Sequence, residues 1–135
     1  MAIDRVLLSI HGVETEGEWQ EEIDRSFKGI AGLAHEGYKY GKFHFWKATY
    51  SAARDSEILA FTKKWDEVYR DTGVVPSVIA HSFGTYVACR ALLRYPAMAF
   101  DHVILCGSIL DCDFDWPSMV ANGRVQAVLN ESCRR

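Results

Sequence analysis

Apolar runs alternate with amphipathic stretches along most of this chain of 135 residues. Five runs are rich in the β-branched, aromatic and other large apolar residues that are typical of strands. They cover residues 6–10, 38–46, 74–79, 100–107 and 123–130. The runs 6–10 and 100–107 are continuous enough to predict strands that are buried on both faces of a parallel sheet.

Three stretches between these strands repeat apolar residues at helical spacing and end at a glycine or a proline. They begin near Thr15, at Asp55 or Ser56, and at Phe83, and they end at Gly29, Gly73 and Pro96. Residues 108–122 are predicted to form a loop with one turn of helix after Pro117. Strands that alternate with helices predict an α/β fold with a mostly parallel central sheet of about five strands and helices on both faces.

The third strand meets the third helix at Ala80-His81-Ser82-Phe83-Gly84. A serine at a sharp strand-to-helix turn, with small residues two positions before and after it, has the pattern of a nucleophile elbow. Small residues are expected at Ala80 and Gly84 because the strand and helix backbones pass close together there. As an alternative, Ser82 could be a simple helix N-cap. That role explains neither Gly84 nor the strand that ends two residues earlier.

With this motif the chain resembles the α/β-hydrolases, in which the elbow serine is the nucleophile of esterases and lipases. The first strand runs into His11-Gly12-Val13, which is similar to the oxyanion loop of that superfamily. The resemblance implies that the backbone N–H groups of Val13 and Phe83 bind an oxyanion, with His11 and Gly12 supporting the loop. It also implies the strand order 2-1-3-4-5 and a small-molecule ester, thioester or acyl substrate. Neither a cofactor nor a metal is implied.

The partners of a catalytic triad are harder to find in this sequence. In the family an acid and then a histidine follow the nucleophile, yet no histidine follows His102. Asp111, Asp113 and Asp115 follow the fourth strand, where a minority of family members place the acid, although aspartates there also form turns. His81 directly precedes the serine, so its side chain is expected to point away across the turn.

We therefore expect residues 1–135 to form a single α/β-hydrolase-like domain that is truncated at its C-terminus. Three explanations stay open: a shortened chain, a histidine that comes from another chain, or a loss of catalysis. The favoured function is a serine hydrolase of the esterase or lipase type, with Ser82 as nucleophile, that is incomplete or weakly active in this form. The alternative is a non-catalytic module that binds acyl groups or a protein partner. A truncated sheet would expose a strand edge, through which molecules associate.

Composition narrows the class of protein further. A net charge of −3 without a basic block argues against a surface that binds nucleic acid. No apolar run is long enough for a membrane span, and the first residues lack the build of a signal peptide. The four cysteines form no CxxC pair and the five histidines form no HExxH motif, so we expect reduced thiols, no zinc and a cytoplasmic protein.

Overall fold

The computed structural model describes residues 2–11, 18–38, 51–110 and 113–131. Within these residues, five strands form one parallel sheet in the order β2-β1-β3-β4-β5. The strands are β1 (Arg5–Ile10), β2 (Leu33–Tyr38), β3 (Ser77–His81), β4 (Phe100–Cys106) and β5 (Val125–Glu131). The predicted strand order is therefore confirmed, and β3, which leads into the serine motif, lies at the centre of the sheet.

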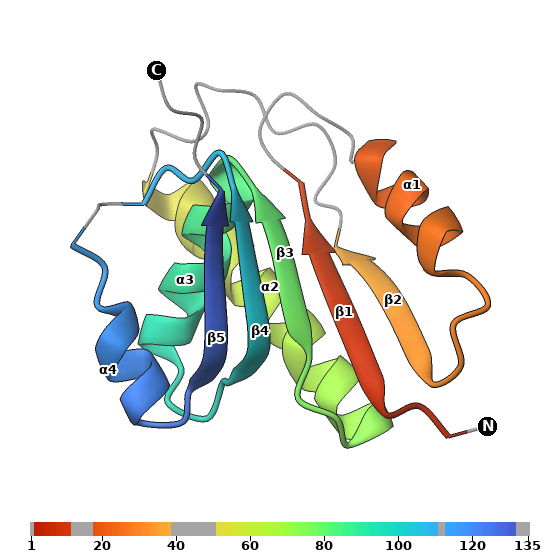
Figure 1. Ribbon diagram of the computed structural model, residues 1–135. Coiled ribbons are helices and arrows are strands. Elements are labelled where there is room, and N and C mark those ends of the chain that lie inside the picture. Colours follow the sequence, from red (N-terminus) through yellow and green to blue (C-terminus); the bar gives the residue numbers. More distant parts are fainter. Residues whose placement is uncertain (1, 12–17, 39–50, 111–112, 132–135) are drawn as a thin grey trace.

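Helices lie on both faces of this sheet, as predicted. Figure 1 shows α2 (Ser51–Thr72) and α3 (Phe83–Arg94) behind the sheet, α1 (Glu18–Phe27) beside β2 and α4 (Trp116–Ala121) beside β5. The main core lies between the sheet and the pair α2 and α3, where Leu8, Ile10 and Phe61 are fully buried. Ser9 alternates with these residues along β1 and so lies on the opposite face, where it contacts Gln20 of α1.

The second strand is where the sequence prediction fails. The strand β2 occupies Leu33–Tyr38, ahead of the predicted stretch 38–46, of which only Tyr38 is among the described residues. Among the described strands β2 lies at the edge of the sheet and pairs with β1 alone, so it does not need a continuous apolar run. Its polar residues, such as His35 and Glu36, hid it from a search for hydrophobic runs.

Helix boundaries differ from prediction in smaller ways. The helix α2 begins at Ser51, ahead of the predicted caps Asp55 and Ser56. It ends at Thr72, and the next residue, Gly73, stops it with a φ of 68° in the left-handed region. The predicted turn after Pro117 is the helix α4, which begins one residue earlier. Its N-cap is Asp115, whose carboxylate accepts a hydrogen bond from the Ser118 N–H.

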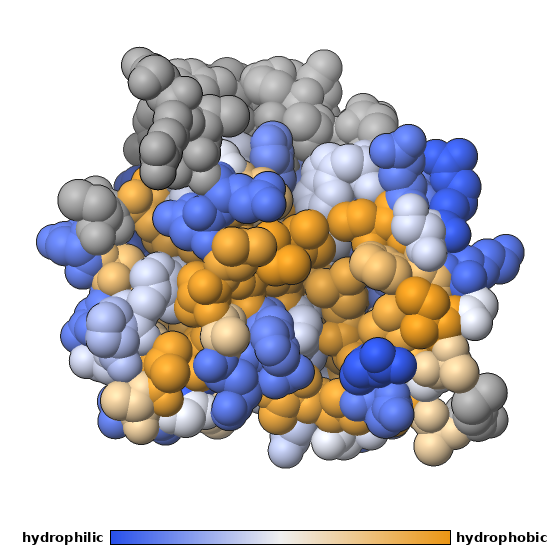
Figure 2. Space-filling model, in the orientation of Figure 1, coloured by the Kyte–Doolittle hydropathy of each residue, from blue (hydrophilic) through white to orange (hydrophobic). Residues whose placement is uncertain are grey.

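Part of the sheet face that carries α1 stays uncovered by any element that the structure describes. Ile79, Ile104 and Leu129 are register partners across β3, β4 and β5 on this face, and Leu129 is 54% exposed. Figure 2 shows apolar side chains gathered over this side of the molecule. Among the described strands β5 pairs with β4 only, so its outer edge is open. Association through this edge stays a prediction. No helix in the described part of the chain is long and apolar enough to cross a membrane.

Candidate active site

Ser82 occupies a strained turn between β3 and α3. Its φ of 52° and ψ of −119° make it the one non-glycine residue with positive φ among the described residues. Left-handed backbone at a side chain larger than hydrogen is unfavourable and persists only where the surrounding structure enforces it. Its side chain makes no capping hydrogen bond to α3. The predicted elbow conformation is confirmed, and the alternative of a simple N-cap is not supported.

Hydrogen bonds on both sides hold this turn in place. The Ser82 N–H donates to the carbonyl of Cys106 at the end of β4, at 3.0 Å. The Ser82 carbonyl accepts from the Thr85 N–H at 3.0 Å and from the Thr85 hydroxyl at 2.6 Å. That hydroxyl also accepts from the Ile109 N–H at 3.2 Å. These hydrogen bonds of Thr85 Oγ1 join the elbow to the segment after β4, and they are shielded from water because Thr85 is fully buried.

Replacing Thr85 by valine, which has the same shape, should therefore loosen the elbow. The change removes the hydroxyl and leaves the Ile109 N–H without its partner, which typically costs about 1–3 kcal/mol of unfolding free energy. Thr85→Ser keeps the hydroxyl and is the matched control. Urea unfolding of the three proteins checks this, and equal stability of Thr85→Val and the parent would show that the bonds to Oγ1 contribute nothing.

Small residues around Ser82 let the helix approach the sheet. A Cβ atom added to Gly84 would lie 2.8 Å from the carbonyl oxygen of Ile10 and 2.9 Å from that of His11. These are backbone atoms at the end of β1, so they have little freedom to move away. On the strand side Ala80 is fully buried against the same core. The expectation that close backbones require a small residue is confirmed at position 84, and at position 80 it stays a prediction.

The oxyanion loop is only partly described. His11 is fully buried at the end of β1, beside the N-terminus of α3. Gly12 and Val13 lie outside the described residues, so the convergence of the Val13 and Phe83 amides stays a prediction. Phe83 begins α3, and its buried ring stacks on Tyr86 at a centroid distance of 5.6 Å. Its backbone N–H belongs to the first turn of a helix, where amides point toward bound anions.

A catalytic base for Ser82 is not found in the described part of the chain. The Ser82 hydroxyl makes no hydrogen bond to a described residue. The His81 ring packs instead against Trp19, with a T-shaped arrangement at 6.4 Å, and together with Ile79 and Cys106 these residues line a pocket of about 320 Å³. His81 is therefore a structural contact between β3 and α1.

The predicted acids differ in their roles. Asp115 accepts hydrogen bonds from the Ser118 hydroxyl at 2.6 Å and from the Ser118 N–H at 3.1 Å. These bonds, the side-chain one above all, lower the pKa of Asp115 and engage it as a helix cap. Asp111 lies outside the described residues, and Asp113 is exposed. No described residue therefore completes a triad with Ser82.

Comparison with known proteins supports the fold of this site. The chain is similar in structure to the Francisella virulence factor BioJ, a protein of the α/β-hydrolase fold, with a TM-score of 0.60. The two are 14% identical in sequence, and the match covers 94% of this chain and 49% of BioJ. This chain has a distant α/β-hydrolase-like fold. It spans about half the length of BioJ. No protein-family model and no curated protein matches the sequence.

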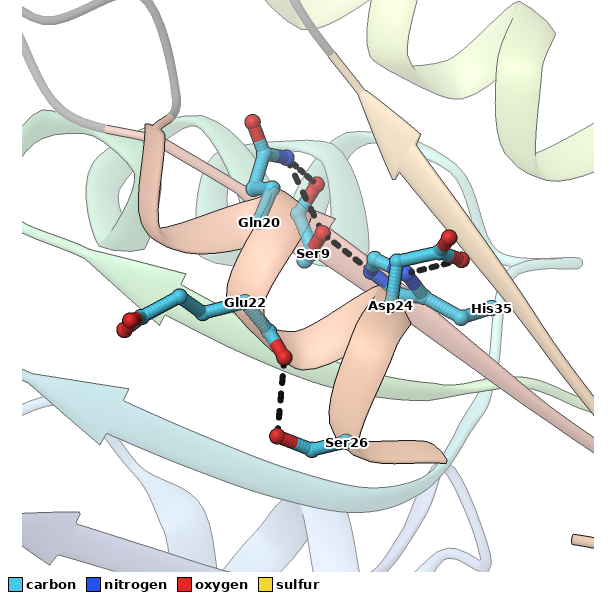
Figure 3. Close-up of polar contacts among 6 residues, drawn as sticks. All are labelled: Ser9, Gln20, Glu22, Asp24, Ser26 and His35. Carbon is cyan, nitrogen blue, oxygen red and sulfur yellow. Dashed lines mark hydrogen bonds and ion pairs between the residues drawn. The ribbon is translucent and has the colours of Figure 1, made fainter. Parts of the chain in front are cut away.

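A second serine, Ser9, lies in a hydrogen-bonded network that the sequence did not reveal. Its Oγ is 2.7 Å from His35 Nε2, and His35 Nδ1 is 3.3 Å from Asp24 Oδ1 (Figure 3). The Gln20 amide donates to Ser9 Oγ at 3.0 Å and to the Ser9 carbonyl at 2.6 Å. Since the amide nitrogen only donates, the Ser9 hydroxyl is free to donate to Nε2, which leaves a proton on Nδ1 for Asp24.

This network has the order Ser-His-Asp, but it is placed to hold the fold together. Ser9 is fully buried near the end of β1 and beneath α1, so no substrate carbonyl reaches its hydroxyl. The adjoining pocket of about 440 Å³ is lined by Gln20 and His35 but not by either serine. The contacts join α1 to β1 and β2. No sequence pattern predicted this network, because its residues come from three separate elements.

Proposed function

We propose that this chain carries the nucleophile of a serine hydrolase of the esterase or lipase type, and that Ser82 attacks a carboxylic ester or thioester. The observation that carries the proposal is the positive φ of Ser82 at a strand–helix junction, with no capping bond from its side chain. Strain of this kind persists where a function requires the conformation. The α/β-hydrolase-like fold supports the same proposal, although a fold alone does not define an activity.

In the proposed reaction, Ser82 Oγ bonds to the substrate carbonyl carbon while a base takes the hydroxyl proton. The carbonyl oxygen becomes an oxyanion beside the first amides of α3, with Phe83 N–H and Val13 N–H as the donors. The alcohol or thiol then leaves with the proton, and water releases the acyl group from Ser82. In this proposal the base comes from outside the described residues, because His81, the histidine next to Ser82, packs its ring against Trp19.

A second function is favoured by that unpaired hydroxyl. Without a base, a serine is a neutral and weak nucleophile at pH 7. The chain would then be a non-catalytic module whose elbow region binds acyl groups or a protein partner. Like the hydrolase, such a module would bind acyl ligands near the elbow. Unlike the hydrolase, it would form no covalent bond to them at Ser82.

Covalent labelling with a fluorophosphonate probe, together with hydrolysis of p-nitrophenyl butyrate, tests the proposal. We expect slow labelling confined to Ser82 and weak turnover, both abolished in Ser82→Ala. Ser77→Ala is the matched control: Ser77 is a half-buried serine of β3, the strand that leads into Ser82, and it accepts a hydrogen bond from the His102 N–H. Labelling that survives in Ser82→Ala would contradict the assignment. An absence of labelling at any pH would favour the non-catalytic module.

A further inference from the structure

A cationic pocket lies beside the elbow, between α2, α3 and the segment that follows β4. Its volume is about 390 Å³. Its walls include two arginines and a tyrosine, with apolar side chains around them: Arg54, Tyr86, Arg90, Leu93, Ile109 and Phe114. Leu93 and Ile109 are 46% and 54% exposed and line the same pocket, so together they offer apolar surface to a ligand.

Both guanidinium groups lie against one aromatic ring. The Cζ atoms of Arg54 and Arg90 are 5.6 Å and 5.4 Å from the centroid of the Tyr86 ring. Neither arginine forms an ion pair with a described residue, and Arg54 Nε is buried without a hydrogen-bond partner among the described residues. In contrast, Arg94 on the same helix as Arg90 pairs with Asp55 at 2.8 Å. A buried donor without a partner is unfavourable, and an anion would satisfy it.

The other charged group at this pocket does not cancel the two arginines. Asp113 also lines the pocket, but it is exposed and forms no ion pair with either arginine. Among the described residues that line the pocket, two positive charges and one negative charge leave a net positive charge. Planar guanidinium groups bind carboxylate and phosphate oxygens in pairs, so the fitting ligand group is one of these anions. The apolar walls fit a hydrocarbon chain attached to it.

The pocket is connected to the elbow through the first two turns of α3. Tyr86 and Arg90 are four residues apart on one face of α3, and Ser82 directly precedes Phe83, the first residue of that helix. At a rise of 1.5 Å per residue, Arg90 is about 12 Å along the helix axis from Ser82. The buried ring of Phe83, the residue after Ser82, stacks on Tyr86, so one aromatic contact joins the pocket wall to the elbow.

From this arrangement we propose that the pocket binds the anionic end of the substrate, a carboxylate or phosphate on an apolar chain. The other end of that chain presents the ester or acyl carbonyl to Ser82. This inference rests on the proposed function, because it assigns the substrate class of the same site. The pocket selects amphipathic anions over neutral esters of equal length.

Direct binding of octanoate and of octyl phosphate, measured by calorimetry, tests the pocket without requiring catalysis. We expect Arg54→Gln and Arg90→Gln each to weaken binding about tenfold, as the loss of a charge-assisted hydrogen bond does. Arg94→Gln is the matched control, because that arginine is already paired with Asp55. Added salt should weaken binding of both anions. The ligand that binds with the higher affinity shows whether carboxylate or phosphate is the preferred anionic group.

Several results would overturn the inference. Binding that is unchanged in both arginine variants, or that is equal for 1-octanol, would show that the hydrocarbon chain alone is recognised. Circular dichroism confirms that each variant is folded, and Arg90→Gln is decisive because Arg90 is exposed. Ser82→Ala should leave binding of both anions unchanged. Arginine-dependent binding without any labelling of Ser82 would therefore disprove the proposed catalysis while supporting the pocket. Labelling of Ser82 without arginine-dependent binding would support the catalysis and disprove the pocket.

Discussion

Replacing Gly84 by alanine should destabilise the protein by about 3 kcal/mol, near the upper end of the usual range for overpacked sites. The added Cβ would lie 2.8 Å from the carbonyl oxygen of Ile10, 2.9 Å from that of His11 and 2.9 Å from Ile10 Cγ2. Relief requires that α3 move away from β1, and that movement would shift Ser82 at the start of the helix. We expect a lowered urea midpoint in unfolding experiments, together with loss of probe labelling in the fraction that stays folded.

Gly73→Ala separates this packing effect from the general effect of removing a glycine. Gly73 has a φ of 68°, and nothing lies within 4 Å of where its Cβ would be. Alanine there is strained by its backbone conformation alone, which typically costs about 1–2 kcal/mol. Gly84→Ala should be the more destabilising of the two although Gly84 is an ordinary helical residue. A smaller loss for Gly84→Ala would show that α3 is free to shift and that the close approach is not required.

Local sequence determines most of what positions the elbow. The third strand ends at His81 and the helix starts at Phe83, so the chain must reverse within one residue. Small residues at positions 80 and 84 allow the strand and helix backbones to pass close together. The motif alone is therefore sufficient to predict this close approach. The parallel order follows in the same way, because helices that connect successive strands leave few possible topologies.

What the sequence did not predict depends on contacts between distant residues. The strand β2 has no apolar run, and its place at the edge follows from pairing with β1. The hydrogen bonds of Ser9 with Gln20 and His35 join three elements, and none of these residues belongs to a motif. The arginine pocket likewise combines α2, α3 and a loop, with 36 positions separating Arg54 from Arg90. Local spacing patterns in a sequence do not predict contacts between residues that are far apart in the chain.

Replacing Ser82 by cysteine should create a reactive thiol even in the absence of a catalytic histidine. Position 82 is followed directly by the 12-residue helix α3, and a helix N-terminus favours the thiolate. The introduced thiol should therefore titrate below the ordinary cysteine pKa of about 8.5. At pH 7 we expect iodoacetamide to alkylate it at least about tenfold faster than Cys106, since each pKa unit changes the thiolate fraction about tenfold.

The two native cysteines in the described part of the chain provide an internal comparison for this experiment. Burial, and secondarily the charge of Glu131, raises the pKa of Cys106 above its usual value, so this thiol stays protonated at pH 7. Burial also raises the pKa of Cys89, a fully buried residue of α3. Peptide mapping by mass spectrometry assigns each alkylated site separately.

Ser108→Cys is the matched control, because it places a thiol on a half-buried loop that does not begin a helix. Below its pKa the thiol at position 82 should lose reactivity about tenfold per pH unit, and the midpoint of this profile should lie below that of the Ser108→Cys protein. A midpoint at or above the control would mean that the first amides of α3 do not stabilise negative charge at residue 82. The oxyanion role of Phe83 would then be untenable, whichever residue supplies the base.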